Sequence, residues 1–259
     1  MAHIIRSPIW PDPRAKPPFG AARVNWAHPL ARDMSTCLLF NEGGGKPQSP
    51  ARETQGAGWS ITGAVWRTGP GGKQLSFDNT SKFVSYDTNN FPFGSLVTVS
   101  AVVIPDLVNS AVHSVFRDST TTAIYLWSTN VWAGYSSPSN EILGTSTVVA
   151  GTTYRVTLVL TPAGRALYVN HAQERADVGT ATSGSGAIKI GSDDFSQHWS
   201  GGIISWCKWN RALSAADVAW LYNEPYSFLR PAIRRRYFVP AAGGATWPGW
   251  MWNKGGWTA

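Results

Sequence analysis

The sequence predicts an all-β sandwich with one short helix near its C-terminal end and an extended arm at each terminus. The composition is the first reason, because 26 Gly, 17 Pro and 14 Trp among 259 residues favour strands and turns over helices. With 43% hydrophobic and 14% charged residues, the chain is globular rather than disordered. The second reason is the large number of short strand-like runs, and the third is that only one segment has a helical pattern. Both argue against a fold in which strands and helices alternate.

The strand-like runs are bounded by Gly, Pro, Asn and Asp, the residues that form turns. In TYRVTLVL, the side chains of Tyr154, Val156 and Leu158 alternate with those of Arg155 and Thr157, which predicts a strand buried on one face. The TPAGRALYV segment that overlaps its end predicts a β-hairpin with Pro and Gly in the connection. The remaining runs lie at 37–40, 64–68, 73–79, 82–88, 96–106, 113–119, 123–130, 131–137, 141–147, 187–194 and 200–210.

One segment, NRALSAADVAWLYNEP, breaks the strand pattern. Ser214 is placed to cap a helix whose third residue is Asp217, a variant of the capping box. Val218, Leu221 and Tyr222 then share one helical face, and the following proline ends the helix.

The net charge of +7 comes from the two ends of the chain. Residues 1–36 carry five Lys/Arg and two Asp, residues 226–259 carry five Lys/Arg and no acid, and the middle is nearly neutral. A nucleic-acid-binding domain more often has a basic face on its folded body, so nucleic acid is not the expected partner. We expect a Pro-rich basic arm at 1–35, a β domain at 36–225 and a basic, Trp-rich arm at 226–259.

The C-terminal arm ends in WPGWMWNKGGWTA, which is too rich in Gly and Pro to fold alone. Arg and Trp dominate interface hot spots, whereas disordered tails are poor in aromatic residues. We therefore expect the arms to dock onto a neighbouring subunit. The expected interface residues are Trp10, Arg230, Arg234, Arg235, Arg236, Tyr237, Trp247, Trp250, Trp252 and Trp257.

Several motifs resemble, in order, the laminin-G-like domains of the concanavalin A-like lectin/glucanase superfamily. They are LLFNEGGGKP, KQLSFDNTSKFVSYD, GTTYRVTLVLTPAGRALYVNHA and, last, GAIKIGSDDFSQHWSGGIISWCKWNRALSAADVAWLYNEP. The resemblance covers roughly residues 36–225 and implies a jelly roll of two antiparallel sheets with the short helix between them. Two features depart from the pattern: the hairpin ends in Asn170-His171 rather than Asn-Gly, and long arms flank the domain.

The resemblance also implies that the first and last strands of the domain lie near each other. Cys37 and Cys207, the only two cysteines, fall on these strands. Two cysteines so far apart in sequence form neither a zinc site nor a CxxC redox pair. They are either separate buried thiols or a disulfide that joins the two strands.

The flanks VNWAHPLARDM and YNEPYSFLRPAIRRRYFV resemble the borders of laminin-G-like proteins of tailed bacteriophages. This resemblance implies a virion protein, assembled in the host cytoplasm and released by lysis. It agrees with an N-terminus that lacks the hydrophobic core of a secretory signal peptide, and with the absence of any apolar run long enough to insert into a membrane.

No catalytic residues are expected. Glucanases of this fold place carboxylates two residues apart on one strand face, and this sequence has no Asp/Glu pair at that spacing. The histidines show no metal-ligand spacing, and no motif of a serine hydrolase, zinc protease or nucleotide-binding loop is present.

Two binding sites are candidates. A calcium ion is a possible ligand of Asp78, Asn79, Asp193 and Asp194, although Asp and Asn are also ordinary turn formers. A glycan site is suggested by the aromatic and polar residues of LWSTNVWAGY, although Trp on a sandwich strand is more often core. The candidate glycan residues are Trp127, Asn130, Trp132 and Tyr135.

Together these observations predict a non-enzymatic structural protein of a tailed-phage virion. It would decorate a capsid or form part of a fibre or tail, and display a domain that contacts host-surface glycans. Its expected partners are other virion proteins, and further copies of the same chain in a homo-oligomer. We expect that no cofactor is required, and calcium is the one candidate ligand among metal ions. The alternatives are a free carbohydrate-binding lectin and, less favoured, a glycoside hydrolase.

Overall fold

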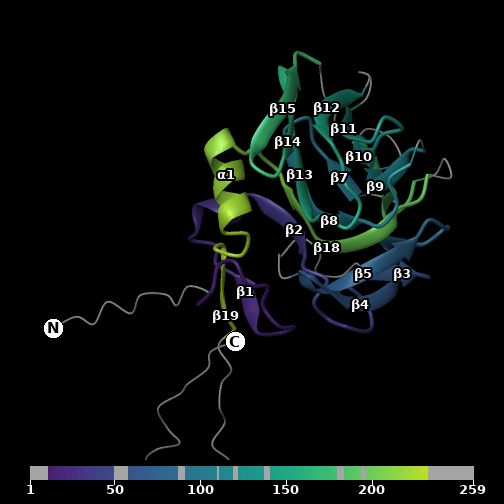
Figure 1. The fold of residues 1–259 in the computed structure, drawn as a ribbon. Helices are drawn as coiled ribbons and strands as arrows, with labels where there is room; N and C mark the ends of the chain where they lie inside the picture. The colour runs from purple at the N-terminus through teal and green to yellow at the C-terminus, as the bar shows by residue number, and fades with distance from the viewer. Residues whose placement is uncertain are drawn as a thin grey trace, which may run out of the picture.

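A computed structural model describes residues 11–49, 58–86, 91–109, 111–118, 122–136, 141–179, 184–193 and 197–232. Two large antiparallel sheets stack face to face, which confirms the expected all-β sandwich (Figure 1). In spatial order, the seven-stranded sheet contains β12 (Ile142–Thr147), β11 (Val131–Ser136), β10 (Thr122–Leu126), β9 (His113–Asp118), β17 (Ile188–Ile190), β6 (Phe83–Tyr86) and β3 (Trp59–Thr62).

The second sheet is built around the longest strand, which pairs with three others. Its order is β15 (Ala172–Asp177), β14 (Gly164–Val169), β13 (Tyr154–Thr161), β8 (Val97–Pro105), β18 (Ser200–Trp209), β5 (Gly72–Asp78) and β4 (Val65–Gly69), with β2 (Met34–Leu38) also paired to β18. Two small sheets are formed by β1 (Ala22–Val24) with β19 (Leu229–Pro231), and by β7 (Phe91–Phe93) with β16 (Gly184–Gly186).

The main hydrophobic core, here called the sandwich core, fills the space between the two large sheets. Alternate residues of each strand enter it, because successive side chains on a strand point to opposite faces. Aromatic rings connect the layers: Trp132 stacks on Trp199 at 6.0 Å, and Phe116 meets Trp206 edge-on at 5.6 Å. All four of these rings are fully buried.

A second hydrophobic cluster, here called the terminal core, covers the other face of the eight-stranded sheet. In Figure 1, α1 (Ala215–Asn223), β1 and β19 lie on the side of this sheet away from β9–β12. The expectation that the helix lies between the two sheets is therefore wrong, because its buried residues pack on the outer face of the eight-stranded sheet. The members of the terminal core are Val24, Leu30, Ala31, Met34, Cys37, Leu39, Val159, Tyr168, Cys207, Trp209, Leu213, Val218, Leu221, Tyr226, Phe228 and Leu229.

The terminal core corrects the expectation for β13, whose second face was predicted to be exposed. Val159 and Thr157 are buried, and Arg155 is only 6% exposed. The alternation of the sequence is correct, since Val156 and Leu158 enter the sandwich core. The other face is covered as well, because segments from both ends of the chain fold back onto it.

The N-terminal segment from residue 11 onward is held to the β domain by specific contacts. The Lys16 ammonium donates to the carbonyl oxygens of Phe40 at 3.0 Å, Ile204 at 2.8 Å and Lys73. A short 3-10 helix, η1 (Pro29–Ala31), follows β1 and buries Leu30, a turn that the sequence did not predict.

The single α-helix confirms the predicted capping box. The Ser214 hydroxyl accepts from the Asp217 backbone N–H, and the Asp217 carboxylate accepts from the Ser214 N–H, both at 3.1 Å. Val218 and Leu221 are buried as expected, whereas Tyr222 is 38% exposed and contacts the His171 ring at 5.0 Å. Among the described residues, no helix has the length and hydrophobicity that crossing a membrane requires.

Candidate functional site

The outer face of the seven-stranded sheet carries a cluster of aromatic side chains, here called the aromatic face. It consists of Arg117 on β9, Tyr125 on β10, Trp127 just after β10, and Tyr135 on β11. They share one face because Ala123 is paired with both Arg117 and Tyr135, and because Tyr125 follows Ala123 by two residues.

The four side chains contact one another. The Tyr125 and Trp127 ring centroids lie 6.4 Å apart, and the guanidinium carbon of Arg117 lies 5.5 Å from the Tyr135 ring centroid. Arg117 also donates from Nη1 to the Tyr125 hydroxyl at 2.7 Å. Arginine therefore orders two of the aromatic rings by a hydrogen bond and a cation–π contact.

The rings differ in how much surface they offer to a ligand. Tyr125 is 2% exposed, and burial raises the pKa of its hydroxyl, so the ring is a neutral support beneath the surface. Trp127 and Tyr135 are half-buried. The small residues Ala123 and Ala133 are buried beside them, and the Arg117 guanidinium lies over the Tyr135 ring.

One of the four residues predicted from the sequence to bind glycan, Trp132, does not lie on the aromatic face. Trp132 is fully buried in the sandwich core against Trp199, because it pairs with the core-facing Leu126; its ring has no face available to a sugar. Asn130 adopts a positive φ of 60° in the turn between β10 and β11, a conformation that Asn tolerates. Sequence reasoning missed Tyr125 and Arg117, although the period of two relates Tyr125 to Trp127.

The residues predicted to bind calcium are engaged with protein groups. The Asp78 carboxylate accepts from Lys82 Nζ at 2.6 Å and from the Thr80 hydroxyl at 2.5 Å, and these bonds lower the pKa of Asp78. Asn79 forms a turn with a φ of 62°. Asp193 accepts from the Gln197 N–H at 2.8 Å.

Asp194 lies outside the described residues. Within the described ranges, no three His, Cys, Asp or Glu side chains gather as a metal site would require. The contacts of the described residues add no support for a calcium site, which stays a prediction.

A buried serine–histidine contact lies in the loop that follows β17. Ser192 Oγ is 2.9 Å from His198 Nδ1, but Ser192 is only 1% exposed. Its hydroxyl also lies 3.1 Å from the Asp193 carbonyl oxygen, to which it donates. With Ser192 buried, the serine–histidine contact holds this loop together.

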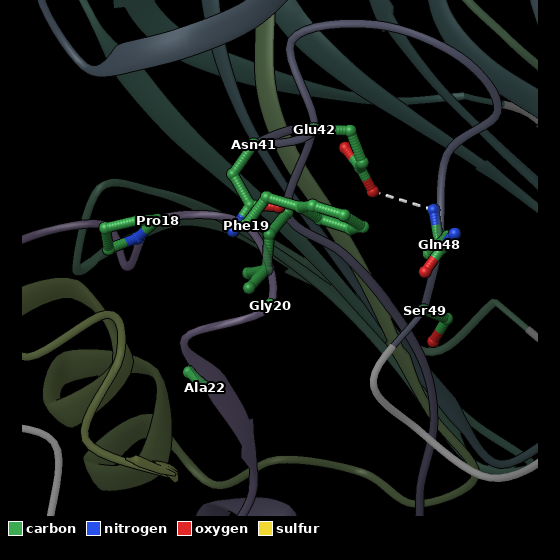
Figure 2. Close-up of a pocket in the computed structure, with 9 residues that line it drawn as sticks. Pro18, Phe19, Gly20, Ala22, Asn41, Glu42, Gln48 and Ser49 are labelled. Atoms are coloured by element: carbon green, nitrogen blue, oxygen red, sulfur yellow. Dashed lines mark hydrogen bonds between the residues drawn. The ribbon is translucent and has the colours of Figure 1, made fainter. Parts of the chain in front are cut away.

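A small pocket lies where the N-terminal segment crosses the Gly-rich loop after β2 (Figure 2). Its volume is about 150 Å³, and Phe19, which is 47% exposed, forms one wall. Glu42 Oε1 accepts from the Gln48 N–H at 2.7 Å, and burial raises the pKa of the Glu42 carboxyl. The sequence could not reveal this pocket, because Phe19 and Glu42 come from separate segments.

Of the predicted assembly residues, only Arg230 lies in the described part of the chain. It sits on β19 opposite Arg23 of β1. The other nine lie outside the described residues: Trp10, Arg234, Arg235, Arg236, Tyr237, Trp247, Trp250, Trp252 and Trp257.

Comparisons with solved structures identify domains with the same sandwich. The binding domain of Paraclostridial Mosquitocidal Protein 1 aligns with a TM-score of 0.61 at 13% identity, over 75% of this chain and 52% of that one. Domain 4 of AbnA, a GH43 extracellular arabinanase from Geobacillus stearothermophilus solved with arabinotriose, aligns at 0.59 and 14% identity, over 78% of this chain and 99% of that one.

Trypanosoma rangeli sialidase with the inhibitor DANA aligns with a TM-score of 0.57 at 12% identity, over 73% of this chain and 32% of that one. No protein-family model matches the sequence, and a comparison with curated proteins finds no match. At these identities the similarity concerns the fold alone. The chain therefore shares the jelly-roll sandwich of these domains, as its laminin-G-like motifs imply.

Proposed function

We propose that this chain is a non-catalytic carbohydrate-binding domain whose aromatic face binds a glycan. The observation that carries the proposal is the pair of half-exposed rings, Trp127 and Tyr135, on one face of the sheet, with the Arg117 guanidinium beside them. Sugar rings present C–H groups that pack on aromatic faces, and their hydroxyls need a few fixed polar partners. The Trp127 and Tyr135 rings would supply the first, and the Arg117 guanidinium would supply the second.

The geometry of the aromatic face favours binding without large rearrangement. Tyr125 is held by Arg117 and lies under the surface, so the two outer rings rest on a fixed layer. Little side-chain entropy is then lost when a ligand is bound. Domain 4 of the arabinanase was solved with arabinotriose, which supports a glycan as ligand for a chain of this fold.

A binding role is favoured over hydrolysis by the distribution of carboxylates. Hydrolysis needs an acid and a second carboxylate on opposite sides of the scissile bond. The acids whose charges act on Tyr125 are Asp193 and Glu141, of which Asp193 is 4% exposed and accepts a backbone hydrogen bond. Neither occurs in the closely spaced arrangement on one strand that glucanases use.

The finer part of the proposal concerns location: the domain would be displayed on a tailed-phage virion, as a capsid decoration or a fibre or tail component. Support comes from the phage-like flanks and from the pairing of β1 with β19, where Ala232 N–H donates to the Ala21 carbonyl at 2.8 Å. Both terminal segments therefore meet at one place, on the side of the molecule away from the aromatic face. The basic, Trp-rich residues beyond 232 would attach the domain to neighbouring subunits.

The glycan proposal is tested by a glycan array with the full chain, followed by calorimetry on the sugars that bind. Trp127→Ala and Tyr135→Ala should each weaken binding about tenfold, because each removes one stacking ring. Trp26→Ala is the matched control, since Trp26 is 39% exposed and lies outside the aromatic face. Unchanged affinity in the Trp127/Tyr135 double variant would refute the proposed site.

Two further results would change the class of function. Polysaccharide turnover that disappears in Glu141→Gln would indicate an enzyme. A chain ending at Ala232 that still enters particles normally would show that the C-terminal arm is not the attachment. A full chain that binds glycan but does not associate with particles would favour a free lectin.

A further inference from the structure

A second cavity lies on the opposite side of the molecule, between the terminal segments and the eight-stranded sheet. Its volume is about 340 Å³. Three cationic side chains line it: Arg14 and Lys16 from the N-terminal segment, and Arg155 from β13. Among the described residues that line this cavity there is no carboxylate.

Arg155 is the central observation, because a charged side chain is almost entirely buried without an acidic partner. It is 6% exposed, and its guanidinium makes one hydrogen bond within the described structure, from Nη1 to Ser100 Oγ at 3.2 Å. Burial lowers the pKa of Arg155, and the groups that oppose this effect are the Tyr226, Cys207, Cys37 and Tyr222 side chains, none of which is a carboxylate.

A guanidinium has five N–H donors in a planar fork and stays charged in proteins. Buried charges are normally paired, because an uncompensated charge in a low-dielectric site is strongly unfavourable. One neutral hydroxyl does not neutralise Arg155. Within the described part of the chain this side chain has no anionic partner, and the cavity that it lines has room for an anion.

The neighbouring groups strengthen this argument. Lys16 directs its three hydrogen bonds to carbonyl oxygens, which bear no net charge, and burial lowers its pKa to about 7 despite the opposing effect of Glu42. The Tyr226 hydroxyl is a neutral donor, because burial raises its pKa. Thr153 adds a second hydroxyl to the lining, and Ile204 adds an apolar wall.

We propose that this cavity is a binding site for a tetrahedral dianion, phosphate or sulfate, held by the Arg155 guanidinium and the Tyr226 hydroxyl, with Arg14 and Lys16 supplying further positive charge. Two negative charges match the two guanidinium groups of Arg14 and Arg155, to which Lys16 adds positive charge when it is protonated. Arginine forks bind such groups through paired, charge-assisted hydrogen bonds. The site is separate from the aromatic face, so it stands whether or not that face binds glycan.

An anion at this position would also join parts of the fold. Arg14, Lys16 and Tyr226 belong to the two terminal segments, whereas Arg155 and Thr153 belong to the sheet region. Binding to the folded state alone raises its stability by mass action. The anion would therefore strengthen the attachment of both terminal segments to the domain.

The test is calorimetry and thermal unfolding of the full chain with sodium phosphate and sodium sulfate, against sodium chloride at equal ionic strength. Both dianions should bind and raise the unfolding temperature. Arg155→Met should weaken binding at least about tenfold, the loss expected when a charge-assisted pair is removed. Arg67→Met is the matched control, because Arg67 is an exposed cation on β4 outside the cavity.

Tyr226→Phe keeps the buried ring and removes only the hydroxyl, so it tests the site if Arg155→Met does not fold. It should weaken dianion binding severalfold with little change in unfolding temperature without ligand. The proposal is overturned if wild type shows no more stabilisation in phosphate and sulfate than in chloride. It is equally overturned if Tyr226→Phe and Arg67→Met both bind like wild type.

Discussion

The thiol sulfurs of Cys37 and Cys207 lie 3.0 Å apart, directly across the pairing of β2 with β18. Both cysteines are free and buried, and Cys207 donates to Cys37. The first strand of the domain and its last strand are therefore neighbours, as the laminin-G-like motifs imply. In this structure the two residues are adjacent thiols, placed where a disulfide between the two strands could form.

We predict that this pair oxidises slowly and to an intramolecular disulfide. Burial raises the pKa of the Cys37 thiol well above its usual range, and the neighbouring Cys207 side chain acts in the same direction, so little reactive thiolate forms at neutral pH. Native protein should resist alkylation, and prolonged treatment with an oxidant should remove two hydrogen atoms from the intact mass. Cys37→Ser should abolish this mass change; rapid alkylation of both thiols in native protein would contradict the prediction.

A second prediction concerns the boundary of the folded domain on the C-terminal side. Phe228 and Leu229 are fully buried in the terminal core, although they lie in the segment that the sequence assigns to the arm. A chain ending at Ala232 should unfold like the full chain, whereas one ending at Pro225 should be markedly less stable. Phe228→Ala alone should cost about 3–5 kcal/mol in the free energy of unfolding.

Urea denaturation followed by tryptophan fluorescence checks this prediction. The Trp26→Ala variant is a suitable control for loss of an aromatic side chain at an exposed position. Equal stability of the two truncated chains would mean that the terminal core contributes little.

A third prediction concerns the pH dependence of stability. His28 Nδ1 accepts from the Leu30 N–H at 3.1 Å, and its ring contacts Trp220 at 4.6 Å, so the fold requires the neutral imidazole. Burial lowers the pKa of His28, while the Glu224 carboxylate acts in the opposite direction. Because the unfolded chain then binds the proton more readily, stability is complete above about pH 6.5 and decreases as the pH falls through that value.

His28→Asn is the matched variant, because Asn retains a capping acceptor but does not titrate. Chemical denaturation at about pH 7.5 and about pH 5 should show a larger loss of stability for wild type than for His28→Asn. An equal loss in both proteins would assign the pH dependence to other groups.

The fold was predictable where its signals are local. The β13–β14 hairpin, the Ser214 cap and the strand periodicity depend on residues close in sequence, and all three are present. The terminal core was not predictable, since Val24 and Leu229 meet only through the pairing of β1 with β19. Nothing local in a strand shows that a distant segment will cover its second face.

The candidate site was predictable in part for a similar reason. Trp132 and Tyr135 are three residues apart on one strand and must point to opposite faces, so the sequence alone excludes a shared face for these two. Which face is the core is harder to decide, because β10 carries apolar side chains on both sides, Ile124 and Leu126 on one and Tyr125 on the other. Arg117 joins the site only through the pairing of β9 with β10.

A last prediction concerns Lys16, whose ammonium is the main polar attachment of the N-terminal segment. It joins the segment to three carbonyl oxygens from separate parts of the domain, at Phe40, Lys73 and Ile204. Lys16→Met keeps the length of the side chain but leaves these acceptors without their donor, at a cost of about 1–3 kcal/mol or more in the free energy of unfolding.

The same change should expose the N-terminal segment to limited proteolysis while the sandwich remains intact, because local opening requires only the contacts of that segment to break. Lys73→Met is the matched control, since the Lys73 side chain bonds to Thr68 at the surface. Mass spectrometry of the first cleavage products distinguishes the outcomes. Cleavage first in the sheets of Lys16→Met, with the N-terminal segment still protected, would show that Lys16 does not hold this segment.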